Sequence, residues 1–589
     1  MTSLSGAAAA APPLRFGIMC SGTSFAAWQA RCIENLLELP GVEAALLIVD
    51  DNPSPQRPLA EKLRQRFASP TTLWRIYQRA FLKSGSPATW PVDLGPKLSH
   101  VPVLRCVTKQ VGKYTQRFFP KDLEAIGSHD LDFILRFGFN IIRGEILTVP
   151  RYGVWSFHHG DPERYRGAPP ALWEIHNREH VTGAVLQRLT DGLDAGIILQ
   201  RGYFKTNASS YVRSRDQLFF GGADWPAKVC VDIRNGRADY VDAPPLATKA
   251  PIYRDPANRQ LLRFLSNQAR SRITDQFASL FRHQQWGVGV IDAPVHEVVG
   301  LSGGKALSHP VRWLSEPSGR FLADPFAIEH VADGGTKLTI VAEDFDWSSN
   351  IGRISAVEST NSGTFGDPRL LMNFPFHMSY PFLFRHDERW YCVPETNEAR
   401  EVCLYAFDPA TLAWEKEATL LRNRRIVDST LVHHDGVWWL FGTDEEQGAN
   451  LKLHLWYADD LKGPWQPHPA NPVKTDIRSS RPAGRPFVHE GRFYRPSQDC
   501  SRSYGGAVTL NLIRKLTPTE FEEEPVSSLG PAPGGPYPDG LHTVCGIGGR
   551  TVIDARRDVF IRQAFNAALS RKGAGLLRRL GKKPPVGTR

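Results

Sequence analysis

Apolar residues in the first part of the chain form short runs that alternate with an amphipathic helical segment. Residues 14–20, 42–49 and 131–135 are apolar runs of strand length. Residues 26–39, between the first two runs, place apolar side chains at helical spacing. Strands that alternate with helices predict an α/β domain built on a parallel sheet. In such a sheet, ligands bind beyond the carboxyl ends of the strands.

From about residue 285 the helical periodicity fades, and short aromatic-rich strands follow one another between Gly, Pro, Asp and Asn. Hairpins recur about every 50 residues, which predicts a β-propeller with one blade per repeat. Four repeats align without gaps and a fifth fits less well, so we expect five blades; a two-sheet β-sandwich is the alternative. The repeats are GTKLTIVAED (335–344), ERWYCVPETN (388–397), GVWWLFGTDE (436–445), GRFYRPSQDC (491–500) and GRTVIDARRD (549–558).

These patterns divide the chain into four parts. Residues 14–205 form the α/β domain, and residues 206–284 a connector or accessory region. Residues 285–560 form the all-β five-bladed propeller, and residues 561–589 a basic tail that we expect to be mobile. Of the 589 residues, 41% are hydrophobic and 22% charged, which is typical of folded domains and excludes global disorder.

The charge and the cysteine content indicate which partners and which cellular compartment to expect. The net charge is +10, but its visible basic cluster is the tail, so a nucleic-acid partner is not favoured. Eight cysteines without a CxxC pair argue against a disulfide scaffold and a cysteine zinc site. The sequence has no apolar run long enough to span a bilayer, and the Ala-rich start lacks the basic region of a signal peptide. We expect a cytoplasmic protein with reduced cysteines, and the sequence does not indicate its oligomeric state.

The most informative polar stretch is residues 153–199. It places His158 and His159 after a strand, then a Pro-, Arg- and Tyr-containing loop, and later an Asp-rich turn at 191–196. An imidazole beside a carboxylate suits proton transfer.

This stretch resembles the formyltransferase family, which uses 10-formyltetrahydrofolate. The family pattern is Asn-x-His, a loop ending Tyr-Arg-Gly, then Thr-Gly, then Asp-x-Gly-Leu-Asp-x-Gly. The chain has Ser156-Phe-His158, Tyr165-Arg166-Gly167, Thr182-Gly183 and the 191–196 turn in the same order. The resemblance covers about residues 14–205 and implies a formyltransferase-like fold.

The resemblance also implies a chemistry. The donor would be 10-formyltetrahydrofolate and the acceptor a primary amine. His158 would stabilise the oxyanion or move the proton, and Asp194 would orient His158. The segment that would line the pteridine of the donor includes Phe137, Gly138 and Phe139.

One position departs from the family pattern. The family Asn is Ser156 here, and loss of one oxyanion donor typically costs about 10²–10³ in rate. His159 could compensate from the next position, and Arg166 could contact an anionic acceptor. The other interpretation is a domain that no longer transfers formyl groups.

Alignment of the propeller repeats places one residue per blade near one end of a central channel: Asp324, Tyr380, Asp428, Gly484 and His542. Glu395 follows the second strand of its blade. A ring of carboxylates suits glycoside hydrolysis or the binding of a sugar. The histidines His433, His434 and His468 give no closed ligand set, so we expect no metal.

The propeller segment resembles the N-terminal domain of glucosamine inositolphosphorylceramide transferases and the arabinanase/xylosidase-type glycosidases. The phrases that carry this resemblance include LADPFAIE (322–329), VDSTLVHHDGVWWLF (427–441) and RPAGRPF (481–487), and it covers about residues 310–560. The glycosidase pattern has a carboxylate where blade two has Tyr380, and a longer Glu where blade three has Asp428.

Together the two resemblances predict a two-part enzyme. The propeller would bind a glycan while the α/β domain formylates the amine of an amino sugar or glycoconjugate. One alternative is a glycoside hydrolase or glycan-processing enzyme that acts at Asp324 and Asp428. The other is a glycan-binding protein without catalysis.

Overall fold

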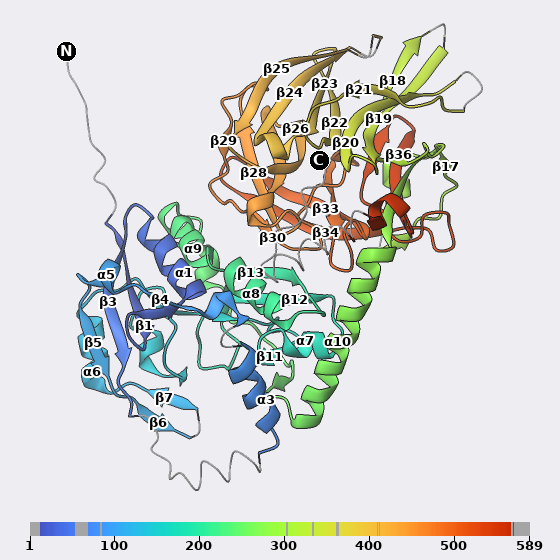
Figure 1. The fold of residues 1–589 in the computed structure, drawn as a ribbon. Helices are drawn as coiled ribbons and strands as arrows, with labels where there is room; N and C mark the ends of the chain where they lie inside the picture. Colours follow the sequence, from blue (N-terminus) through green and yellow to red (C-terminus); the bar gives the residue numbers. More distant parts are fainter. Residues whose placement is uncertain are drawn as a thin grey trace, which may run out of the picture. The chain divides into compact units, whose positions relative to one another are not determined.

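The computed structural model has two compact units, residues 1–271 and 272–589 (Figure 1). Each unit is described below by itself. The tail expected to be mobile lies mostly outside the described residues. The structure describes residues 12–53, 69–82, 85–112, 114–301, 304–332, 335–360, 364–408, 410–411, 413–566 and 569.

The first unit is built on a seven-stranded sheet with the strand order β13-β12-β10-β8-β1-β3-β5. Five strands are parallel, as expected, whereas β12 and β13 run antiparallel to their neighbours, so the sheet is mixed. The strands are β1 (Leu14–Cys20), β3 (Val42–Asp50), β5 (Val103–Cys106), β8 (Phe133–Arg136), β10 (Val154–His158), β12 (Val181–Arg188) and β13 (Ile197–Lys205).

Amphipathic helices cover this sheet. Helix α1 (Ala27–Leu37) buries Trp28, Cys32 and Leu36 on one face and packs against β3 and α9. The side chain of Gln29 accepts the backbone N–H of Ala26 at 3.0 Å, which satisfies a free donor at the helix start. The other helices are α3 (Thr72–Tyr77), α5 (Gly95–Leu98), α6 (Pro120–Gly127), α7 (Leu172–His176), α8 (Tyr211–Gly221), α9 (Trp225–Arg234) and α10 (Asn258–Phe281).

Residues 206–271, which the sequence set apart as a connector or accessory region, fall in the first compact unit. Helices α8 and α9 pack against α1 and β13. The side chains Trp225 and Val229 of α9 are buried. Short strands complete the unit: β2 (Ser24–Ala26), β4 (Pro91–Asp93), β6 (Lys109–Val111), β7 (Thr115–Arg117), β9 (Ile141–Ile142), β11 (Arg166–Gly167) and β14 (Ile252–Tyr253).

Among the described residues, the second unit has five sheets, one for each sequence repeat, and their strands pair antiparallel except for the short parallel pair of β16 and β34 in blade four. This confirms the five-bladed propeller and excludes the two-sheet sandwich. Blade one has β18 (Arg320–Ala332), β19 (Gly335–Asp346), β20 (Ile351–Glu358) and β21 (Arg369–Met372); blade two has β22 (Ser379–His386), β23 (Arg389–Glu395), β24 (Glu401–Asp408) and β25 (Ala413–Arg422); blade three has β26 (Ile426–His434), β27 (Val437–Asp444), β28 (Lys452–Ala458), β29 (Gln466–Pro467) and β30 (Lys474–Thr475); blade four has β31 (Phe487–His489), β32 (Arg492–Asp499), β33 (Ala507–Leu516), β34 (Phe521–Gly530) and β16 (Lys305–Ala306).

Blade five joins the two ends of the propeller sequence. Its strands β35 (Val544–Ile547) and β36 (Arg550–Val559) come from the end of the repeats, and β15 (His283–Ile291) and β17 (Arg312–Trp313) come from the start. Strand β36 pairs with β15 over its whole length, from His283 opposite Val559 to Ile291 opposite Thr551. This pairing closes the ring of blades, and it leaves neither β36 nor β15 as an unpaired edge strand.

Two further expectations bear on the setting. All eight cysteines are buried and none forms a disulfide. Within the described residues, no helix is both long and apolar enough to cross a membrane.

Candidate active site of the first unit and carboxylate cluster of the propeller

The structure brings His158 and Asp194 together. Nδ1 of His158 lies 3.4 Å from Oδ1 of Asp194, and its Nε2 lies 2.8 Å from the backbone carbonyl oxygen of Tyr165. The carbonyl oxygen of Tyr165 can only accept, so Nε2 donates to it, and a proton gained at Nδ1 would be shared with Asp194. The carboxylate therefore faces the ring, and its role in orienting His158 stays a prediction.

Local backbone geometry sets this pair in place. Asp194 has φ 48°, and its Oδ2 accepts the backbone N–H of Gly167 at 2.8 Å. A Cβ at Gly160 would lie 2.8 Å from both Nε2 of His158 and the carbonyl oxygen of Tyr165. Only glycine therefore lets the loop carbonyl reach the imidazole.

Ser156 lies two residues before His158 on β10, on the same face of the sheet. Its Oγ accepts hydrogen bonds from Nε and Nη2 of Arg136 at 3.2 and 3.0 Å. Arg136 ends β8, the parallel neighbour of β10, and directly follows Leu135, which pairs with Trp155. The position of the family Asn is thus occupied by a serine joined to a guanidinium.

Arg136 is held from a second side. Its Nη1 donates to the backbone carbonyl oxygen of Asn140 at 2.8 Å. Burial lowers the pKa of Arg136, and the nearby Asp194 carboxylate opposes that shift. An arginine remains charged in proteins, so this face of the sheet carries a fixed cation.

The segment expected to meet the folate directly follows β8. Backbone N–H groups of Phe137 and Gly138 donate to the carbonyl oxygen of Met19, each at 2.8 Å. A Cβ at Gly138 would lie 2.9 Å from the backbone of Cys20, so the loop requires glycine there. Phe139 has φ 62° and packs against Phe118. Contact of these residues with a donor stays a prediction.

The side chains and backbone groups described above are of the kinds that formyl transfer needs. An imidazole–carboxylate pair can hold a proton, and the adjacent N–H and O–H groups can donate to a carbonyl oxygen. They lie at the carboxyl ends of β8 and β10, where ligands bind in parallel sheets.

His159 points to the opposite face of the sheet from His158. Its ring packs against Trp28, Phe157 and Phe219. Burial, aided by the nearby His158 and Arg215, lowers its pKa to about 3. The structure therefore places a neutral, packed imidazole there, away from the pair formed by His158 and Asp194.

Arg166 is engaged by the protein itself. Its Nη2 donates to the carbonyl oxygen of Leu193 at 2.5 Å, and its Nη1 lies 3.5 Å from that of Ala250. It thereby ties the loop to the turn that carries Asp194. Its predicted contact with an anionic acceptor stays a prediction.

The propeller residues aligned by sequence do occupy corresponding places. Asp324, Tyr380 and Asp428 each stand at a β-bulge between the first two strands of their blade, with φ of 50°, 43° and 52°. Gly484 has φ 118°. A non-glycine residue with positive φ is uncommon, and bulges re-aim a side chain. The same backbone device is therefore used in successive blades.

In blade three the carboxylate is fully engaged. Asp428 is 1% exposed and receives N–H bonds from Nε and Nη2 of Arg481, the latter at 3.1 Å. Nε2 of Gln498 donates to the same carboxylate at 2.9 Å. The backbone N–H of Asp428 donates to Glu395 at 3.1 Å, and Arg481 lies 3.8 Å from that carboxylate. Arg481 thus neutralises the cluster.

In blade two, Tyr380 replaces the carboxylate. Its hydroxyl accepts the backbone N–H of Gly484 at 2.8 Å and lies 2.9 Å from Oγ1 of Thr430. The ring is fully buried. Through the two contacts of its hydroxyl, Tyr380 links blade two to blades three and four.

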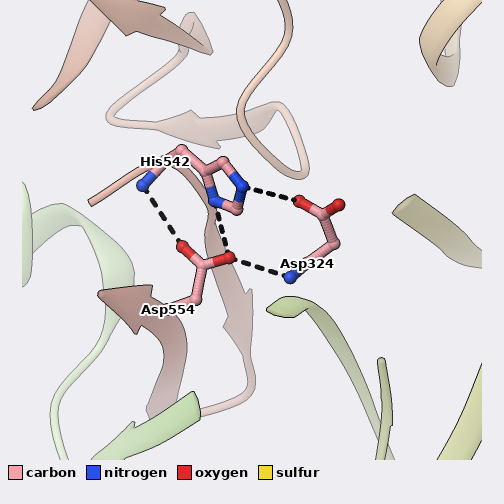
Figure 2. Close-up of side chains that lie close together, drawn as sticks. All are labelled: Asp324, His542 and Asp554. Atoms are coloured by element: carbon pink, nitrogen blue, oxygen red, sulfur yellow. Dashed lines mark hydrogen bonds and ion pairs between the residues drawn. The ribbon is translucent and has the colours of Figure 1, made fainter. Parts of the chain in front are cut away.

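Asp324 belongs to a second buried group, with His542 and Asp554 (Figure 2). Nδ1 of His542 lies 2.6 Å from Asp554, and its Nε2 lies 3.6 Å from Asp324. Asp554 also accepts the backbone N–H groups of Asp324, His542 and Thr543. The three side chains lie close enough for a shared cation, but the oxygens of Asp554 are already used by these donors.

Burial shifts the titration of this cluster. It raises the pKa of Asp324 to about 6, against the opposing effect of His542. It also raises the pKa of Glu343 and Glu395, and neighbouring carboxylates add to both shifts. Burial lowers the pKa of His542, but Asp554 and Asp324 outweigh this and raise it overall.

Two functional positions were not found from the sequence. Arg136 lies among the apolar residues of a strand, and its place in the site depends on the pairing of β8 with β10. Asp554 had a usable signal, because it stands where the four other aligned repeats have apolar residues or proline: Ile340, Val393, Phe441 and Pro496.

Comparison with known proteins separates the two parts of the chain. The family model "Glucosamine inositolphosphorylceramide transferase 1, N-terminal" matches residues 311–530. The rice protein glucosamine inositolphosphorylceramide transferase 1 (Oryza sativa subsp. japonica) is 35% identical over 246 residues, which are 39% of this chain and 32% of that protein. The propeller is similar to the N-terminal part of this transferase.

The first unit is formyltransferase-like. The methionyl-tRNA formyltransferase of Prochlorococcus marinus subsp. pastoris is 32% identical over 111 residues, 18% of this chain and 34% of that enzyme. The chain thus spans about a third of the length of these curated relatives. A solved GH43 β-xylosidase/α-arabinofuranosidase from a compost microbial metagenome is 13% identical, with a TM-score of 0.27 over 35% of this chain and 73% of that chain.

Proposed function

We propose that the protein transfers a formyl group from 10-formyltetrahydrofolate to the amine of an amino sugar or glycoconjugate. The observation that carries the proposal is the contact between His158 and Asp194 beside Ser156, on one face of the sheet. The similarity of the first unit to formyltransferases supports it.

The donor supplies a formyl carbon that is open to attack by an amine. Asp194 has one carboxylate oxygen fixed by the N–H of Gly167, and the other faces Nδ1 of His158. A proton released from the attacking amine can be held between these two groups. The loop carbonyl of Tyr165 fixes the opposite edge of the imidazole.

The propeller supplies the glycan-binding part of the proposal. Its similarity to a transferase named for glucosamine inositolphosphorylceramide supports a sugar-containing ligand. The engagement of Asp428 by Arg481 and Gln498 favours binding over hydrolysis, because a general acid needs a carboxyl free to protonate the leaving group.

The first test is calorimetric titration of the full chain with a stable 10-formyltetrahydrofolate analogue, followed by formyl transfer to a panel of amino sugars. We expect saturable binding and a formylated product, with binding weakened in Asp194→Ala. A folded protein that neither binds the analogue nor formylates any amine would contradict the proposal and turn attention to glycan binding or hydrolysis at the propeller.

A further inference from the structure

The guanidinium of Arg136 stands where the donor of a formyltransferase site is required. It lies beside Ser156 on the sheet face that carries His158, and it makes hydrogen bonds with Ser156 Oγ through two of its nitrogens. Its third nitrogen is tied to the carbonyl oxygen of Asn140, which fixes the plane of the group.

We propose that Arg136 and Ser156 act together as the oxyanion-stabilising group of this site, in place of a single asparagine. The inference rests on the proposed formyl transfer and identifies two residues that carry one step of it. The Arg136 side chain supplies positive charge, and the Ser156 hydroxyl supplies a directed donor.

The hydrogen bonds determine the direction of the serine proton. Ser156 Oγ accepts two N–H groups from Arg136, so its own proton points away from the guanidinium. A hydroxyl polarised by a neighbouring cation is a stronger donor than an isolated serine. The loss expected from replacing asparagine by serine is thereby offset.

The rest of the site leaves this task to Arg136 and Ser156. Both nitrogens of His158 already face acceptors, Asp194 on one side and the Tyr165 carbonyl on the other. We therefore assign the imidazole to proton transfer and not to stabilisation of the oxyanion. Burial lowers the pKa of Arg136, and the nearby Asp194 carboxylate opposes that shift, so the site holds a negative and a positive group close together.

The reaction step balances as follows. The amine nitrogen forms a bond to the formyl carbon, and the carbonyl π electron pair moves to the oxygen, which then carries the negative charge. Ser156 donates its hydrogen bond to that oxygen, and the charge of Arg136 stabilises it. When the carbonyl re-forms, the bond from carbon to the donor nitrogen breaks, and that nitrogen takes the electron pair and the proton that the amine gave up.

The test compares Arg136→Met and Arg136→Lys in the full chain. We expect kcat for formyl transfer to fall about 10²–10³-fold in Arg136→Met and less in Arg136→Lys, which retains a charge but not the planar donors. Binding of the folate analogue and the thermal unfolding midpoint report on folding and donor binding separately. We expect both to stay near wild type in Arg136→Lys.

A second readout does not depend on turnover. Formate is an anion of the size of the reacting group, and its dissociation constant can be measured by calorimetry with tetrahydrofolate present. We expect formate to bind at least tenfold more weakly to Arg136→Met than to wild type. Equal formate affinity together with wild-type kcat in Arg136→Met would overturn the inference.

Rescue separates a stabilising role from a merely structural one. The double variant Arg136→Met/Ser156→Asn restores the family amide, and we expect it to recover most of the lost kcat. In Ser156→Asn alone the amide oxygen can accept from Arg136 while its N–H₂ donates to the oxyanion, so we expect its kcat to exceed that of Arg136→Met. If wild type transfers formyl groups and Arg136→Met does so equally well, this inference is wrong and the proposed function stands. If the folded wild type transfers no formyl group, both are contradicted.

Discussion

Two arginines show how a single side chain can redefine a site. Arg136 brings charge to the position where the formyltransferase pattern has an uncharged amide, and Arg481 cancels charge at the position where a glycosidase needs a free acid. Both act through two donors on one partner, which is a geometry that lysine does not reproduce. The hydrogen bonding at each of these two positions therefore depends on an arginine that the fold brings to it.

Replacing Asp194 by asparagine tests the proton-handling pair at the residue scale. Asparagine tolerates φ 48° and can still accept the N–H of Gly167, so the turn should keep its shape. It loses the charge that holds the imidazole proton. We expect kcat for formyl transfer to fall about 10²–10⁴-fold with an unchanged unfolding midpoint.

The matched control is Asp191→Asn in the same turn. Asp191 accepts the backbone N–H of Gly144 at 3.2 Å and, within the described residues, forms no hydrogen bond or ion pair with His158. Its kcat should stay within a few fold of wild type. Equal losses in the two variants would remove the charge of Asp194 from the mechanism.

Arg481→Met should destabilise the propeller. It would leave the carboxylates of Asp428 and Glu395 buried without their counter-ion, and breaking a buried pair in this way costs about 3–5 kcal/mol. Chemical denaturation followed by tryptophan fluorescence measures the loss. In Arg481→Met/Asp428→Asn much of the stability should return; a double variant no more stable than the single one would show that charge is not the cause.

At the scale of elements, a β-bulge recurs between the first two strands of successive blades. In blades one to three a residue with positive φ interrupts the pairing of the first two strands at the same place. Blade four uses Gly484, where a Cβ would lie 1.9 Å from the carbonyl oxygen of Val544. Blades four and five thus approach each other through a backbone that has no room for a side chain.

Gly484→Ala tests that approach. We expect the free energy of unfolding of the propeller to fall by about 3 kcal/mol, because strain at φ 118° adds to overlap with the Val544 carbonyl. Gly436→Ala is the control, since Gly436 also has positive φ, 78°, but has open space around it, and about 1–2 kcal/mol is expected there. Equal costs would mean that backbone strain alone matters.

The elements themselves were largely predictable. The five aligned segments correspond to β19, β23, β27, β32 and β36, the second strands of the five blades, because alternation and turn residues are local signals. The antiparallel direction of β12 and β13 was not, since strand direction depends on which edge each connection returns to. The opposite facing of His158 and His159 was not predicted, since His159 was expected to compensate for Ser156, although strand alternation turns neighbouring residues to opposite faces.

At the scale of the molecule, the buried carboxylates make the stability of the propeller depend on pH. The pKa of Asp324, Glu343 and Glu395 is raised in the folded state, so the folded state binds protons more tightly than the unfolded chain. His542 has a raised pKa as well, and its contribution is lost as pH rises through that value. All four groups give the same sign.

We therefore expect the unfolding midpoint of the propeller to fall as pH rises from about 5 through the pKa of about 6 of Asp324 and on through the raised pKa of His542. Glu523, whose pKa is lowered by Arg495 and Lys474 despite burial, acts only at acid pH, below its ordinary range near 4.5. Differential scanning calorimetry measures the trend, and Glu395→Gln should flatten it. A midpoint that rises over this interval would show that these carboxyls are ionised in the folded state.

The sequence by itself determined the two architectures and most of the candidate residues. Apolar periodicity and turn residues are local properties, and they predicted the α/β sheet, the five repeats and the ring positions Asp324, Tyr380 and Asp428. The resemblance to formyltransferases, carried by an ordered motif, implied the pair of His158 and Asp194. The similarity to formyltransferases and to the transferase N-terminal region agrees with this division.

Only the tertiary structure decided what stands beside these residues. Arg136 meets Ser156 because β8 and β10 are neighbours in register, and Arg481 meets Asp428 across 53 residues of chain. Asp324, His542 and Asp554 come together because the last blade closes against the first strands of the ring. Charge and hydrogen bonding act through space, so the partner that sets the chemistry of each group lies where folding places it, at a sequence distance that no local pattern encodes.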